Sequence, residues 1–195
     1  MKNKIIDCTG LNCPIPVINT KKALSEIKEG IIEVIIDNEI AKVNIEKLAT
    51  NQNMKYDVID SEGKFIIKIT KELSEDQKKS IKNNEKFTIV IGTDVMGQGS
   101  EELGRILIKG YIFALSESEV KPTDIIILNG GVKLAVEGSN VIESLRKLEK
   151  QGIKIQVCGT CLEYYKVKDL LKVGEISNMY SIVETMNSSD KIINI

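Results

Sequence analysis

The stretch "KIIDCTGLNCPIPVINTKKALSEIKEGIIEVIID", residues 4–37, contains the order of elements that decides the fold. Its β-branched start predicts a short strand. The segment that follows places Val17, Leu24 and Ile27 at helical spacing and ends on Gly30, so it predicts a helix. A second, denser β-branched run comes next and predicts another strand. Strand, helix and strand in this order indicate a β-α-β unit.

The next segments complete a small domain. "EIAKVNIEKLATNQN" predicts a second helix, with Ile40, Val43 and Leu48 on one apolar stripe. "KYDVID" and "KFIIKIT" flank a turn signal at residues 61–63 and predict a hairpin. The sequence therefore predicts an N-terminal domain over residues 1–71, a two-layer sandwich with the order β-α-β-α-β-β.

Residues 72–86 are nearly all charged or polar and are interpreted as a linker. From Phe87 onward the strands "FTIVIG", "DIIILN" and "IKIQVC" alternate with the helical segments "GSEELGRILIKGYIFALSE" and "SNVIESLRKLEKQG". "SNMYSIVETMN" and "KIINI" add a last helix and strand. This alternation predicts a C-terminal α/β domain over residues 87–195, with a mainly parallel sheet and helices on both faces.

Composition excludes several classes of function. The chain has a formal net charge of -1, so nucleic acid and anionic membranes are not expected as partners. No apolar run is long enough to span a bilayer and the start is too polar for a secretory signal, so a cytoplasmic location with reduced thiols is expected. The absence of histidine excludes Cys-His and Ser-His-Asp nucleophiles, and any reactive thiol must depend on its surroundings. We expect neither a cofactor nor a metal ion.

Cys13 stands directly before two prolines. Proline is favoured in the first turn of a helix and disfavours helical geometry in the residue before it, so a helix should begin within a residue or two of Cys13. Unpaired backbone N–H groups and the helix dipole would stabilise a thiolate there. Gly10 and Pro14 are candidate substrate-binding residues beside it. The alternative is a buried cysteine that packs as a small hydrophobic residue. Cys8 is either a resolving thiol for Cys13 or, as we favour, a core residue at the end of a strand.

The motif "GLNCPIP", placed after a first strand, resembles the TusA/SirA family of small sulfur-carrier proteins, whose mark is Cys-Pro-x-Pro at the start of the first helix. The position in the β-α-β-α-β-β order matches as well as the letters. The resemblance implies that Cys13 accepts a sulfur atom as a persulfide and hands it to another protein.

"IQVCGTCLEYY" places Cys158 at the end of a predicted strand and Cys161 near the start of a short helix. A helix N-terminus lowers the pKa of a thiol. The pair is also compatible with a redox dithiol, with packing, or with half of a zinc site whose other ligands would be Cys8 and Cys13. Of these alternatives, the redox dithiol is the strongest, because strand, C-x-x-C and helix is the arrangement that such chemistry uses.

Two further loops are expected near this thiol pair. In a parallel sheet, ligands bind at the carboxyl ends of the strands, and these ends carry "GTDVMGQGS", "NGGVKLAVEGS" and "CGTC". Asp94, Asn129 and Gly131 are therefore candidate substrate-binding residues. The glycines do not have the spacing of a P-loop or of a dinucleotide-binding fingerprint. "KVGEISNMY" is expected to be another ordered loop beyond the sheet, with its Met179 and Tyr180 in the core.

The order of elements, with "GQGSEELG", "NGGVKLAVEGS", "CGTCLEYY" and "VGEISNMY", resembles the YedF-type sulfurtransferase-like proteins, which couple a TusA-like domain to a DsrE/DsrF-like one. The resemblance implies that Cys158 carries persulfide sulfur, with Cys161 as an additional neighbour. It also implies a homo-oligomer, and selenium as an alternative cargo.

The preferred hypothesis is a sulfur or selenium carrier. Cys13 takes the atom from a donor such as a cysteine desulfurase and relays it, to Cys158 or to a downstream acceptor protein. One alternative is a thiol-disulfide oxidoreductase that uses Cys158 and Cys161. The other is a non-enzymatic regulatory binding protein in which the thiols are incidental.

Overall fold

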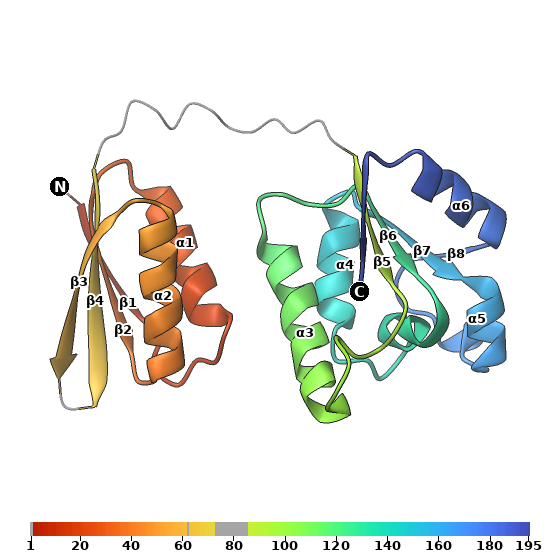
Figure 1. Ribbon diagram of the computed structural model, residues 1–195, viewed down its shortest axis with the longest axis horizontal. Coiled ribbons are helices and arrows are strands. Elements are labelled where there is room, and N and C mark those ends of the chain that lie inside the picture. The colour runs from red at the N-terminus through yellow and green to blue at the C-terminus, as the bar shows by residue number, and fades with distance from the viewer. Residues whose placement is uncertain (1, 62, 73–85) are drawn as a thin grey trace. The chain divides into compact units, whose positions relative to one another are not determined.

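The computed structural model describes residues 2–61, 63–72 and 86–195. These residues fall into an N-terminal and a C-terminal compact unit, and each is described by itself (Figure 1). Most of the linker expected over residues 72–86 lies outside the described residues. Within the described ranges, no helix is both long enough and apolar enough to cross a membrane.

The N-terminal unit has the predicted order of elements. They are β1 (Lys2–Asp7), α1 (Ile15–Glu26), β2 (Gly30–Ile36), α2 (Glu39–Asn51), β3 (Lys55–Ser61) and β4 (Lys64–Lys71). The strands lie in the order β1-β2-β4-β3, with β1 parallel to β2 and both hairpin strands antiparallel to their neighbours. Both helices cover the same face of this sheet (Figure 1). The two-layer prediction is confirmed.

The core of this unit lies between the sheet and the helices. Alternate residues of β2, which are Ile32, Val34 and Ile36, are fully buried. Helix α2 turns a different stripe inward than the sequence predicts, because Ala41 and Ile45 are buried while Ile40 is 70% exposed. Val43 on the predicted stripe is exposed as well, whereas Leu48 packs against the core as predicted. Both stripes of α2 are apolar, so periodicity does not choose between them, and the small alanines allow close packing against α1, β3 and β4.

The C-terminal unit contains eleven elements within residues 86–195. They are β5 (Phe87–Ile91), α3 (Glu101–Glu117), β6 (Asp124–Ile127), the 3-10 helix η1 (Asn129–Ala135), α4 (Ile142–Lys150), β7 (Lys154–Cys158), α5 (Gly159–Tyr164), the 3-10 helix η2 (Lys168–Leu170), β8 (Glu175–Ser177), α6 (Met179–Asn187) and β9 (Lys191–Asn194). All five strands are parallel, in the order β8-β7-β6-β5-β9.

Helices cover both faces of this sheet, as predicted. Helices α3 and α4 lie on one face and α6 on the other (Figure 1). The larger core, which includes Ile125 and Val157, packs beneath α3 and α4. The smaller core joins Val90, Ile126 and Cys158 to Ile182 of α6. Cys158 is thus a core residue beneath α6.

Two local predictions for the C-terminal unit are wrong. Met179 and Tyr180 are 57% and 74% exposed rather than buried. They form the first turn of α6, which begins after the cap residue Asn178 and buries its face one turn later, at Ile182. The segment expected to be a loop between β7 and α6 also contains an edge strand, β8.

Candidate functional site

Cys13 is exposed at the start of α1. The helix begins at Ile15, two residues after the thiol, which confirms the position predicted from the prolines. Asn44 reaches across from α2, and its Nδ2 atom donates to Cys13 Sγ over 3.6 Å. The thiol therefore stands at the surface, beside a side-chain amide that can donate a hydrogen bond to a negatively charged sulfur.

Few backbone donors face this thiol. Pro14 and Pro16 have no N–H group, and the N–H of Ile15 donates to the carbonyl of Asn12 over 3.0 Å. The expected row of unpaired N–H groups is therefore short at this helix end. Asn44 is the donor that the sequence analysis missed, because its position depends on the packing of α2 against α1.

The loop before Cys13 is tied to the end of β2. Gly10 has a φ of +71°, a conformation that favours glycine, and its N–H donates to Asp37 Oδ2 over 2.7 Å. Thr9 donates from its backbone N–H and its hydroxyl to Asp7, and these bonds lower the pKa of that carboxyl. Gly10 thus shapes the loop that presents Cys13, and its predicted role in substrate binding stays a prediction, as does that of Pro14.

Cys8 is fully buried in the core of the N-terminal unit. Burial raises the pKa of its thiol, and the Asn19 side chain contacts its sulfur from 3.9 Å. The interpretation of Cys8 as a core residue at a strand end is confirmed.

Cys158 and Cys161 lie at the junction of β7 and α5, as predicted. Cys158 is the last residue of the strand and is 3% exposed, among Val90, Ile126 and Ile182. Cys161 lies in the short helix, is half-buried, and packs against this same cluster. The two thiols contact each other, and Cys161 is the one nearer to solvent.

Asn129 brings a backbone donor to Cys161. Its N–H donates to Cys161 Sγ over 3.1 Å, from a backbone with a φ of +44°. The Tyr165 hydroxyl donates to Asn129 Oδ1 over 3.0 Å, and Lys133 Nζ lies 4.9 Å from the centre of the Tyr165 ring. The structure therefore brings the predicted residues Asn129 and Cys161 together. Tyr165 and Lys133 were not identified from the sequence, because only the folded loops place them here.

The electrostatic environment of Cys161 differs from the sequence-based expectation. Burial raises the pKa of its thiol, the contact with Cys158 raises it further, and the Asn129 N–H lowers it in part. We expected a lowered pKa from the helix N-terminus. Helix α5 has only six residues, and the desolvation of Cys161 is the larger effect.

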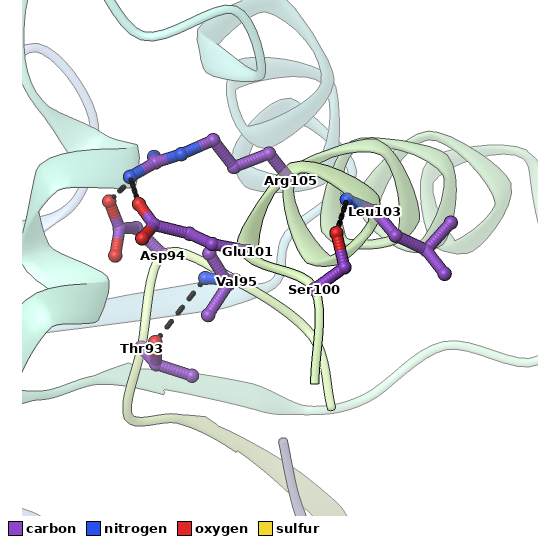
Figure 2. Close-up of polar contacts among 7 residues, drawn as sticks. All are labelled: Thr93, Asp94, Val95, Ser100, Glu101, Leu103 and Arg105. Carbon is purple, nitrogen blue, oxygen red and sulfur yellow. Dashed lines mark hydrogen bonds and ion pairs between the residues drawn. The ribbon is translucent and has the colours of Figure 1, made fainter. Parts of the chain in front are cut away.

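Asp94 follows β5 at the carboxyl edge of the sheet, and Figure 2 shows its surroundings. Its Oδ2 accepts from Arg105 of α3 over 2.9 Å, and Arg105 also pairs with Glu101 over 2.5 Å. Glu101 and Asp94 together raise the pKa of the guanidinium. Asp94 thus ties the loop after β5 to α3, and its predicted contact with substrate stays a prediction.

Gly131 has a packing role that the sequence did not reveal. A Cβ atom there would lie 2.5 Å from the carbonyl oxygen of Ile91, so only glycine fits against the end of β5. A cleft of about 510 Å³ opens nearby, with charged walls formed by Asp94, Arg105 and Lys133. Within the described ranges 2–61, 63–72 and 86–195, cysteines and carboxylates form no group of three that could hold a metal ion.

The structure thus has an exposed thiol at a helix start in one α/β unit and a thiol pair at a strand-to-helix junction in the other. The chain belongs to the DsrE/DsrF-like family, which matches residues 85–195. Residues 4–71 match a second family, Sulfurtransferase TusA.

Individual proteins are similar to parts of this chain. The chain is 43% identical over 72 residues to a Methanocaldococcus jannaschii protein named as a sulfur carrier, covering 35% of this chain and 93% of that protein. The solved structure of the SirA-like protein of Desulfitobacterium hafniense is 34% identical, with a TM-score of 0.34. The match covers 35% of this chain and 99% of that protein. The ychN protein of E. coli is 21% identical, with a TM-score of 0.45, and the match covers 57% of this chain and 99% of that protein.

Proposed function

We propose that this chain is a sulfur carrier that holds the transferred atom as a persulfide on Cys13. The exposure of Cys13 is the observation that carries the proposal. All four cysteines are described, and the other three are buried or half-buried. The similarity of residues 4–71 to TusA, and of 72 residues to a protein named as a sulfur carrier, supports it.

The transfer needs no net oxidant. The Cys13 thiolate attacks the terminal sulfur of a donor persulfide, a new S–S bond forms on Cys13, and the donor cysteine leaves as a thiolate. The Asn44 amide, 3.6 Å from Cys13 Sγ, is placed to stabilise negative charge on that sulfur before the attack. A cysteine desulfurase is the proposed class of donor. Selenium, held as a perselenide, is an alternative cargo, implied by the resemblance to the YedF-type proteins.

The proposal includes onward transfer from Cys13. The thiol pair of the C-terminal unit is one acceptor, with Cys158 as the residue implied by the family resemblance, and a separate acceptor protein is another. A homo-oligomer is part of the same proposal. The donor and the acceptor follow from the resemblance and from the chemistry of thiols, and the homo-oligomer follows from the resemblance alone.

The test is loading by a cysteine desulfurase with cysteine, followed by intact-protein and peptide mass spectrometry. Cys8 and Cys13 share one tryptic peptide, because no lysine or arginine lies between them. The variants Cys13→Ser and Cys8→Ala therefore distinguish the two thiols. We expect the mass of one sulfur atom on this peptide in the wild type and in Cys8→Ala, and none in Cys13→Ser. Loading that persists in Cys13→Ser would overturn the assignment.

A second candidate function, thiol-disulfide exchange, is favoured by one observation, the contact of Cys158 with Cys161. It predicts a reversible disulfide between these residues and an activity that does not need Cys13. Reduction of a disulfide substrate by the Cys13→Ser variant at the wild-type rate, with no sulfur loading in either protein, would favour this function.

A further inference from the structure

We propose that Cys161 is the sulfur-accepting thiol of the C-terminal unit and that Cys158 is a buried resolving thiol, so that the pair releases sulfane sulfur as hydrogen sulfide. This assignment reverses the one implied by the family resemblance, which gives the accepting role to Cys158. The proposal goes beyond the role of Cys13 as a sulfur carrier, and it rests on the proposed function only for the physiological source of the sulfur.

Access distinguishes the two thiols. Cys158 is 3% exposed and is enclosed by Val90 and Ile126 of the sheet and Ile182 of α6. A persulfide on a protein or a small thiol must bring its terminal sulfur into line with the attacking sulfur, which this packing prevents. Cys161 is half-buried, at the rim of the same cluster. The incoming sulfur therefore meets Cys161 first.

A hydrogen-bond donor is directed at the accepting atom. The Asn129 N–H lies 3.1 Å from Cys161 Sγ and stabilises negative charge on that sulfur. The side chain of Asn129 is held in turn by the Tyr165 hydroxyl over 3.0 Å. Lys133 Nζ lies over the ring of the same Tyr165 and helps to hold that side chain in place. Cys158 lies deeper, in the apolar cluster with Ile126 and Ile182.

The reaction has two steps. In the first, Cys161 attacks the terminal sulfur of a persulfide R–S–SH, the S–S bond of the donor breaks, and R–S⁻ leaves and takes up a proton. In the second, Cys158 attacks the inner sulfur of the Cys161 persulfide, the disulfide between Cys158 and Cys161 forms, and HS⁻ leaves. The dithiol loses two electrons, and the persulfide gains them as it becomes a thiol and sulfide. A dithiol reductant then restores both cysteines.

Because the two thiols contact each other, the second step can take place within the C-terminal unit. Cys158 is the cap residue of α5 and Cys161 lies three residues later, so resolution needs no movement of one unit against the other. Burial raises the pKa of the Cys161 thiol, so its thiolate fraction, and with it the rate of the first step, should increase as the pH rises through the alkaline range.

The test uses the full chain with Cys13→Ser, so that Cys13 takes no part, and glutathione persulfide as the sulfur donor. We expect sulfide release together with the loss of two hydrogen atoms from the peptide that contains Cys158 and Cys161. Adding Cys158→Ala should lower sulfide release at least about tenfold and leave one extra sulfur on Cys161, because the resolving thiol is missing. Adding Cys161→Ser should abolish both the adduct and the release.

Two outcomes would overturn the assignment. One is an extra sulfur on Cys158 in the Cys161→Ser variant, and the other is undiminished sulfide release from the Cys158→Ala variant. Cys158→Ser is a second resolving-thiol variant of similar size, which guards against a packing defect from alanine. Because every protein in this test lacks Cys13, a failure here is distinct from a failure of persulfide loading on Cys13.

Discussion

Replacing Gly131 with alanine should destabilise the C-terminal unit. The new Cβ would lie 2.5 Å from the Ile91 carbonyl oxygen and 3.1 Å from its carbon. That carbonyl is fixed, because it accepts the N–H of Leu128 over 2.9 Å at the end of β5. Neither backbone can move without breaking this bond, so we expect a loss of about 3 kcal/mol, at the upper end of the usual cost of overpacking.

The adjacent Gly130 provides a matched control. A Cβ there would meet atoms of Thr93 and Asp94 at 3.7 Å or more, which is ordinary contact, so Gly130→Ala should cost far less than Gly131→Ala. Both variants can be assayed by alkylation of buried cysteines in a Cys13→Ser background, where Cys158 reports on the C-terminal unit and Cys8 on the N-terminal unit. We expect Gly131→Ala to speed labelling of Cys158 about a hundredfold with Cys8 unchanged. If Gly131→Ala labels no faster than Gly130→Ala, the close-approach argument is wrong.

Other substitutions test the thiol sites. Asn44→Ala removes the amide beside Cys13. It should slow Cys13 alkylation at neutral pH about fivefold, a factor that corresponds to the free energy of one hydrogen bond. An unchanged rate would show that Asn44 does not act on Cys13. Asn178→Ala removes the cap that accepts the Ser181 N–H over 3.1 Å and should destabilise α6 by about 1 kcal/mol. Cys158 alkylation should then accelerate while Cys8 labelling does not, and equal acceleration of both would contradict a local effect. Because burial raises the pKa of Cys8, the folded state binds its proton more tightly than the unfolded state. This contribution to stability is complete below about pH 8.5, where an unfolded cysteine titrates, and is lost as the pH rises toward the folded pKa. Hydrogen exchange of β2 should accelerate with pH in that range beyond its intrinsic dependence, and Cys8→Ala should remove the excess.

Most of the fold was predictable because strands and helices alternate with clear periods. The β-branched runs became β2, β5, β6 and β7, and the prolines marked the start of α1. Periodicity did not identify the buried face where two stripes of one helix are apolar, as in α2. It also did not distinguish exposed apolar residues from core residues, as at Met179 and Tyr180. In each case the orientation depends on tertiary packing, which local spacing does not contain.

The candidate site was predictable in its residue types and less so in its contacts. The placement of Cys158 and Cys161 at a strand-to-helix junction followed from the pattern, and so did the approach of Asn129. The burial of Cys158 did not, because it requires α6, which lies more than twenty residues further along the chain. For the same reason the contact of Asn44 with Cys13 could not be found from the sequence.

The unequal exposure of the cysteines also sets how the chain would respond to oxidative damage. An oxidant in solution meets Cys13 first, and its sulfinic and sulfonic acid forms are not reversed by thiols. Such a lesion would leave the core intact, because Cys13 lies outside it, so the damaged chain would stay folded while the oxidised sulfur could no longer act as a nucleophile. Cys8, five residues earlier, is shielded by the strands around it, and only unfolding would expose it to the same reagent.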